Sequence, residues 1–278
     1  MSVLRGKRLG IVGAGNMGQA LLGGLRAAGV PAGALLVSER DRRRCAQVRQ
    51  RFGVGCVALE ALLRRASVVL VAVKPQDIRD VLRQIGAARR HRNVLVISIA
   101  AGIPIRAMAR LAGRGPVVRV MPNLPATIGS GISALAWGRG VSAADRAVAR
   151  AIFQGVGEVI VVPERLLDAV TAISGSGPAY FFAVFQALRE AGVRRGLPGE
   201  VAERLAVCTA LGSAKLALEA PGRLPGLIAR VASKKGTTEA ALKVFRRRRL
   251  AAVIEAGVRA AAQRSKELTA LLETRVGG

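Results

Sequence analysis

Glycines at a fixed spacing lie early in the chain, in the run Gly13-Ala14-Gly15-Asn16-Met17-Gly18. An apolar segment, Leu9–Val12, precedes the run, and a helical pattern over Asn16–Ala28 overlaps its end. In a βαβ unit the first glycine permits a tight turn, the second lets the backbone approach a pyrophosphate, and the third lets helix and strand pack closely. Free N–H groups at the helix start attract the phosphates. The sequence therefore predicts a dinucleotide site at Gly13, Gly15, Asn16, Met17 and Gly18.

Polar residues follow the second expected strand, Ala34–Val37, about 20 residues beyond Gly18. They read Ser38-Glu39-Arg40-Asp41-Arg42-Arg43-Arg44. An acidic side chain at this point binds a ribose 2′-hydroxyl, whereas a serine followed by arginines suits a 2′-phosphate. Ser38 and Arg40 favour NADP, and Glu39 leaves NAD open.

Three further loops follow expected strands: Val71-Ala72-Val73-Lys74-Pro75, Ala100-Ala101-Gly102 and Met121-Pro122-Asn123-Leu124-Pro125. Ligands of open α/β sheets bind beyond the carboxyl ends of the strands, so we expect these loops beside the cofactor. Plain connecting loops would explain the same residue types. The predicted cofactor contacts in them are Ala72, Val73, Lys74, Pro75, Ala100, Gly102 and Asn123.

Short apolar strands alternate with helical stretches up to about residue 163. The strands are expected at Leu9–Val12, Ala34–Val37, Val68–Val73, Val94–Ala100, Val117–Met121 and Val159–Val162. This alternation predicts an α/β fold with a doubly wound, mostly parallel sheet. After Pro163 only helical spacing occurs, and several helices are apolar on more than one face, which is typical of burial in a subunit interface. We expect a dinucleotide-binding domain over 1–163 and a helical, self-associating domain over 164–278.

Composition excludes several function classes. The chain has 278 residues, three scattered cysteines and one histidine, His91, so no metal site is expected and a reducing cytoplasm fits. No apolar run approaches the roughly 20 residues that a membrane span needs. The net charge of +27 would attract nucleic acid, but only 3% of residues are aromatic and could stack on bases. We therefore expect a small-molecule substrate and self-association, without nucleic-acid binding.

At this point the sequence resembles the pyrroline-5-carboxylate reductase family. The resemblance covers about residues 8–268 and rests on motifs in the family's order and spacing. These are the glycine run, the three loops above, Ser174-Gly175-Ser176-Gly177-Pro178-Ala179-Tyr180 and Gly236-Thr237-Thr238. It implies reduction of 1-pyrroline-5-carboxylate to L-proline by NAD(P)H, the last step of proline biosynthesis. It also implies a Rossmann domain, a helical dimerisation domain and larger assemblies of dimers.

The resemblance also assigns a substrate site. Thr238 would be the catalytic residue, hydrogen-bonding the ring nitrogen and supporting its protonation. Ser233, Gly236 and Thr237 would bind the substrate carboxylate, with Ser174 and Ser176 close to the nicotinamide and substrate. Read from the residues alone, Ser233–Thr238 is a hydroxyl-rich turn that leads into a helix and offers N–H donors to an anion. Without the resemblance, helix capping is the favoured explanation of its threonines, and the resemblance favours substrate binding instead.

Two departures from the family pattern concern ligand binding. Lys235 stands where the family commonly has a glycine, and Val57-Ala58-Leu59 lacks an asparagine that the family often has near the adenosine. Lys235 motivates an alternative, a related reductase of another cyclic imine or a small hydroxy acid. A second alternative is a basic NADP-binding protein with little catalysis.

Overall fold

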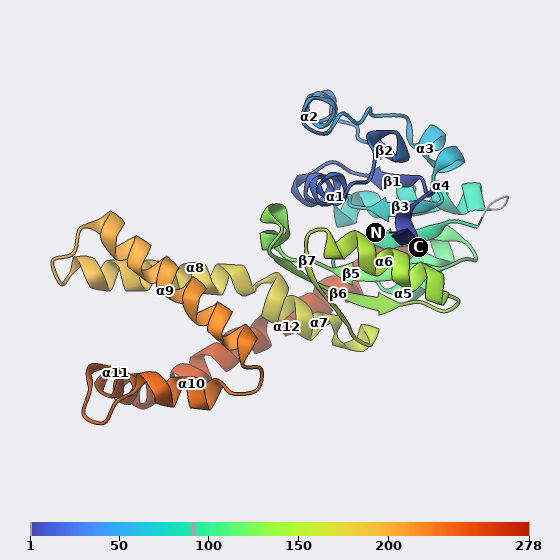
Figure 1. Cartoon of the computed structure of the whole chain (residues 1–278). Helices are drawn as coiled ribbons and strands as arrows, with labels where there is room; N and C mark the ends of the chain where they lie inside the picture. Colours follow the sequence, from blue (N-terminus) through green and yellow to red (C-terminus); the bar gives the residue numbers. More distant parts are fainter. Residues whose placement is uncertain (1, 90–92, 278) are drawn as a thin grey trace. The chain divides into compact units, whose positions relative to one another are not determined.

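The computed structural model describes residues 2–89 and 93–277 and has one seven-stranded sheet (Figure 1). The strand order is β2-β1-β3-β4-β5-β6-β7, and every neighbouring pair is parallel except β5 and β6. The strands are β1 (Leu9–Val12), β2 (Leu35–Ser38), β3 (Val68–Val71), β4 (Leu95–Ser98), β5 (Val117–Met121), β6 (Gly131–Trp137) and β7 (Gly157–Val161). The expected doubly wound, mostly parallel sheet is confirmed.

Helices cover both faces of this sheet. One hydrophobic core joins the sheet to α1 (Asn16–Ala27), α2 (Arg42–Phe52) and α6 (Ala143–Gln154). A second core joins the opposite face to α3 (Leu59–Arg65), α4 (Ile78–Arg89), α5 (Ile105–Ala112) and α7 (Leu167–Val170). β1, β3 and β4 are buried along their whole length, which explains why their sequences are continuous apolar runs.

The remaining helices follow one another without further strands. They are α8 (Gly177–Val193), α9 (Gly199–Glu219), α10 (Leu224–Val231), α11 (Thr237–Arg247) and α12 (Leu250–Gly277). The helical texture expected after Pro163 is present in the structure. The chain divides into two compact units, Met1–Ser176 with Ala261–Gly278, and Gly177–Ala260. The functional division at residue 163 stays a prediction.

The last part of α12 belongs to the compact unit that contains the sheet. Ser265 is buried, and its hydroxyl donates to the Asp168 carboxylate of α7 at 2.7 Å. Further along the helix, Leu272 packs beside Gly102, where a Cβ would lie 2.9 Å from the leucine Cδ1. The chain end is therefore held against the loop that follows β4.

Candidate functional site

A pocket of about 1000 Å³ lies beyond the carboxyl ends of β1, β2 and β3. We call it the dinucleotide pocket. Nine of the predicted cofactor residues line it: Gly13, Gly15, Asn16, Met17, Ser38, Arg40, Ala72, Val73 and Lys74. The wall also contains Val57, Ala58 and Leu59, the segment that lacks the family's asparagine. The place that the sequence predicted for a ligand is thus a real cavity.

Each glycine of the turn meets a different steric demand. Gly13 has a φ of +95°, and a Cβ there would lie 2.7 Å from the Ala72 carbonyl oxygen. A Cβ on Gly18 would overlap the carbonyl of Gly13, so this glycine lets α1 approach the turn. At Gly15, the N-cap of α1, a Cβ would meet nothing within 4 Å. The protein's own packing therefore does not explain Gly15, whereas a pyrophosphate lying against the helix start does.

The Glu39 carboxylate is turned towards the glycine run. It accepts hydrogen bonds from the backbone N–H groups of Ala14 at 2.8 Å, Arg40 at 2.8 Å and Asp41 at 3.0 Å. Burial raises the pKa of this carboxyl, but the three N–H donors and nearby Arg44 outweigh burial, so the pKa is lowered from its ordinary value. Glu39 is therefore ionised, and its oxygens already have partners within the protein.

Two arginines flank this carboxylate at the pocket wall. Arg44 lies 3.7 Å from Glu39, and Arg40 lies 3.6 Å from Asp77. The Arg40 side chain is 77% exposed and the Arg44 side chain 46%, so both ion pairs are weak and open to a competing anion. Arg44 was not among the predicted contacts. Its position four residues after Arg40, at the start of α2, could have indicated a second arginine for the cofactor.

Five of the predicted cofactor residues are not placed on the wall of this pocket, among them Gly18, which lets α1 approach the turn. Ala100 and Gly102 follow β4, and α12 packs beside Gly102. Asn123 uses its side-chain oxygen to accept a 2.9 Å hydrogen bond from the Ile132 N–H, which ties the loop to β6. The Pro75 side chain lies outside the described part of the chain. Cofactor contact by these residues stays a prediction.

Ser174 and Ser176 lie at the end of a π-helical turn, Thr171–Gly175. The Ser174 hydroxyl donates to the Val170 carbonyl at 3.1 Å. A Cβ on Gly175 would lie 2.5 Å from Cε of Met121, so this turn packs on the end of β5. The structure thus brings the serine turn, which the resemblance assigns to the nicotinamide, together with the Met121 loop, which was expected beside the cofactor. π-helical turns within helices frequently occur at functional sites.

The expected substrate turn, Ser233–Thr238, lies in the other compact unit. Gly236 is the N-cap of α11 and has no side-chain capping bond. Thr237 and Thr238 are the first two helical residues, and within the described chain no hydrogen bond of their hydroxyls is found. Helix capping therefore does not account for these threonines, and their hydroxyl and N–H groups remain available to an anion.

Lys235 adopts the left-handed conformation, with a φ of +60°. Its N–H donates to the Glu239 carboxylate one turn into α11, and its side chain is exposed. The position therefore requires a backbone shape that favours glycine, and the lysine maintains that shape at a cost.

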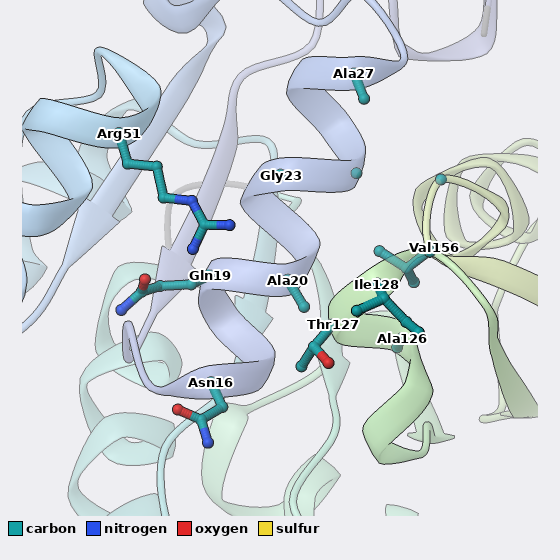
Figure 2. A pocket seen from close by; sticks show the side chains of 13 residues that line it. Asn16, Gln19, Ala20, Gly23, Ala27, Arg51, Ala126, Thr127, Ile128 and Val156 are labelled. Carbon is teal, nitrogen blue, oxygen red and sulfur yellow. The ribbon is translucent and has the colours of Figure 1, made fainter. Parts of the chain in front are cut away.

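A second pocket, of about 490 Å³, is lined by one face of α1, by Arg51 of α2 and by residues 126–129 and 155–156. Figure 2 shows Gln19 of α1 and Arg51 of α2 on one side, with Thr127 and Ile128 of the η4 turn (Leu124–Ile128) on the other. Asn16 lines both pockets. The Gln19 amide donates to the Ala14 carbonyl at 3.0 Å and so supports the glycine turn from behind.

No group of three or more potential metal ligands occurs in residues 2–89 and 93–277. No helix in that part of the chain is both long enough and apolar enough to cross a membrane. His91 lies outside the described residues.

A Rossmann-type sheet whose glycine turn opens into a dinucleotide-sized pocket defines this chain as a dinucleotide-binding protein of the oxidoreductase class. Residues 8–102 match the family "NADP oxidoreductase coenzyme F420-dependent", and residues 164–268 match "pyrroline-5-carboxylate reductase dimerisation". The chain belongs to the pyrroline-5-carboxylate reductase family. The resemblance seen in the sequence is thereby confirmed.

Individual relatives agree over nearly the full length. A pyrroline-5-carboxylate reductase of Pseudomonas aeruginosa is 42% identical over 94% of this chain and 96% of its own. The structure of one from Coxiella burnetii matches with a TM-score of 0.90 and 33% identity, over 95% of this chain and 98% of its own. A Plasmodium falciparum pyrroline carboxylate reductase with NADP bound matches with a TM-score of 0.84 and 27% identity, over the same shares.

Proposed function

We propose that this protein reduces 1-pyrroline-5-carboxylate to L-proline with a reduced nicotinamide dinucleotide. The observation that carries the proposal is the match to relatives of that name over 94% of the chain. The dinucleotide pocket and the uncapped threonine turn supply the two kinds of binding site that the reaction needs.

NADPH is the cofactor that the pocket favours. The Glu39 oxygens are occupied by three backbone N–H groups, so this carboxylate is poorly placed to receive a ribose 2′-hydroxyl. Ser38, Arg40 and Arg44 line the same wall and provide a hydroxyl and two guanidinium groups for a 2′-phosphate. When bound, the reduced nicotinamide supplies the hydride.

The α11 turn would hold the substrate. The N–H group of Thr237 and the hydroxyl of Ser233 are suited to a carboxylate, because a helix start presents free donors and a partial positive charge. The Gly236 N–H donates to the Ser233 carbonyl at 3.0 Å, so Gly236 would shape the turn around the carboxylate. The Thr238 hydroxyl oxygen can accept a hydrogen bond from the protonated ring nitrogen and so favour this charged, electrophilic form. Positioning of this kind, rather than a metal or a covalent nucleophile, provides the rate enhancement.

Lys235 does not favour the alternative substrates. Its backbone has the left-handed shape that a glycine would adopt there, and its side chain is exposed. The turn therefore keeps the geometry expected of the family despite the substitution.

The direct test follows oxidation of NADPH and of NADH with pyrroline-5-carboxylate as substrate. Turnover with a lower KM for NADPH supports the proposal, and absence of oxidation with both cofactors refutes it. Gly15→Ala should weaken cofactor binding without loss of stability, because the added methyl enters space that only a ligand fills. Gly33→Ala is the matched control, since a Cβ there also meets nothing within 4 Å but lies outside the dinucleotide pocket.

Thr238 is tested in the same assay. Thr238→Ala should lower kcat by about 100-fold, within the range for a lost proton-handling group, while cofactor affinity changes little. Thr238→Ser keeps the hydroxyl and should recover most of the activity. Unchanged turnover in Thr238→Ala would exclude the assigned role.

Self-association through residues 164–268 belongs to the same proposal, because that segment matches the family's dimerisation region. Three free cysteines without a disulfide suit a reducing compartment, and we propose the cytoplasm as the location.

A further inference from the structure

A basic pocket of about 530 Å³ lies where α4 and α5 end and β4 and β5 begin. Among the residues that the structure describes, its wall contains Arg83, Arg89, Arg110 and Arg114 and no acidic residue. We call it the arginine pocket. It shares no lining residue with the dinucleotide pocket, and the proposed reaction uses none of its arginines.

Arg89 forms the buried floor of the arginine pocket. The residue is 8% exposed, and its guanidinium donates to the carbonyls of Val94 and Pro116, both at 2.6 Å, and of Gly113 at 3.3 Å. Burial lowers the pKa of this group to about 10, so it remains charged at neutral pH. Within residues 2–89 and 93–277 no carboxylate pairs with it. The result is a buried positive charge balanced only by carbonyl dipoles.

Two glycines set the spacing of the arginine pocket. A Cβ on Gly86 of α4 would overlap the Leu111 carbonyl of α5, so the two helices meet backbone to backbone. A Cβ on Gly115 would lie 2.9 Å from the Arg89 guanidinium carbon. The close approach of α4 and α5 therefore holds the pocket walls in place through backbone contacts rather than through mobile side chains.

The other three arginines are exposed, and none of them has an ion pair in the part of the chain that the structure describes. Asp80 lies one turn before Arg83 on α4, and the two side chains form no ion pair there. The dipole at a helix C-terminus stabilises cations within the last turn, which accounts for Arg89 and Arg110. It does not account for Arg83, which lies in the middle of α4. Gathering like charges costs free energy unless an anion joins them.

We propose that the arginine pocket binds an anion that carries at least two phosphoryl groups. Guanidinium groups match phosphoryl oxygens with paired N–H donors, and three unpaired guanidiniums surround one cavity here. Inorganic pyrophosphate and the diphosphate of a free nucleotide share this chemistry. The buried charge of Arg89 strengthens the attraction of the pocket for an anion, while its N–H groups stay hydrogen-bonded to backbone carbonyls.

The experiment titrates the full-length protein with inorganic pyrophosphate in a calorimeter at 0.15 M salt. The double variant Arg83→Ala/Arg110→Ala should lose about tenfold or more in affinity. The control Arg139→Ala/Arg150→Ala removes the same charge from two exposed arginines outside the pocket and should bind as the unaltered protein does. Parallel titration with ADP distinguishes the two sources: ADP binding that the Arg83→Ala/Arg110→Ala variant loses, and that is tighter than pyrophosphate binding, indicates a nucleotide. ADP bound in the dinucleotide pocket is unaffected by that variant, because the two pockets share no described lining residue.

Thermal unfolding provides a second readout. Pyrophosphate should raise the Tm of the unaltered protein and of the control but leave the Arg83→Ala/Arg110→Ala variant unchanged. Without pyrophosphate that variant should be at least as stable as the parent, since it relieves repulsion. The absence of a saturable binding signal, or equal weakening in both double variants, would overturn the proposal, since equal weakening marks general attraction to a chain of charge +27.

Discussion

Glu39 is held by backbone N–H groups from two segments, because Ala14 lies 25 residues before it in the chain. Glu39→Gln removes the charge that these donors stabilise and should lower the free energy of unfolding by about 1–2 kcal/mol at pH 7. Because its folded pKa is lowered, Glu39 contributes stability above its ordinary pKa of 4.5, and that contribution is lost as pH falls through the folded value. Urea unfolding at pH 7 and below pH 4 measures the difference.

The difference between the parent and Glu39→Gln should therefore narrow in acid. Glu158→Gln is the control, since Glu158 is exposed and should show little effect at either pH. A difference that stays constant with pH would contradict the assignment of the stabilisation to the Glu39 charge.

Lys235 offers a second prediction at the scale of one residue. Lys235→Gly should stabilise the protein by about 1 kcal/mol, because glycine adopts a φ of +60° without the steric cost that a side chain carries. The control Lys234→Gly changes the preceding residue, which has no positive φ, and should be neutral or destabilising. Thermal unfolding of the two variants compares them. A lower Tm for Lys235→Gly would show that the lysine side chain stabilises the turn.

The role of a single residue could be predicted from the sequence where steric limits on the backbone fix it. It could not be predicted where it depends on the direction in which a side chain points. Gly18 is required by the Gly13 carbonyl of the same motif, and Gly13 by its positive φ and the Ala72 carbonyl after β3, so the motif's spacing located both glycines. The direction of the Glu39 carboxylate depends on a contact between distant segments, so NAD and NADP stayed open. The uncapped state of Thr238 likewise depended on which residue became the N-cap of α11, and that residue is Gly236.

The elements were largely predictable, with one clear omission. β6 (Gly131–Trp137) was not expected, because its sequence, Gly-Ile-Ser-Ala-Leu-Ala-Trp, has few β-branched residues and no polar alternation. Its middle is buried, and it pairs antiparallel with β5, so tertiary packing rather than local propensity makes it a strand. Without β6 the sequence could not show that β7 joins the sheet by pairing parallel with a strand that itself runs antiparallel to β5.

Helix α1 can be tested through two of its glycines. Gly18→Ala should push the helix away from the Gly13 carbonyl, with a loss of about 1–3 kcal/mol in stability and weaker cofactor binding. Gly23→Ala is the matched control on the same helix, because its Cβ would lie 3.5 Å from Phe52, an ordinary contact. Higher helix propensity should make that variant slightly more stable. Equal behaviour of the two variants, in unfolding and in cofactor titration, would refute the packing role of Gly18.

At the scale of the whole molecule, the unit Gly177–Ala260 has almost no core of its own. Its buried apolar residues are the small Ala202 and Ala206, whereas Phe181, Leu211 and Ile254 are each more than half exposed. Helices that bury so little cannot be stable as an isolated layer, and large apolar surfaces of this kind mark an interface between chains. The apolar faces that the sequence shows on the helices after Pro163 would therefore be buried against a second copy of the chain.

We expect the purified protein to sediment as a dimer or a larger assembly at every concentration at which it is folded. Leu211→Asp places a charge on an exposed face of α9 and should weaken association by several kcal/mol, because burying an unpaired carboxylate is costly. Ile128→Asp makes the same chemical change on a side chain that is 79% exposed in the sheet-containing unit, and it should leave the assembly intact. Sedimentation of the three proteins decides the matter, and a folded, monomeric parent would show that the apolar surface of Gly177–Ala260 needs no partner.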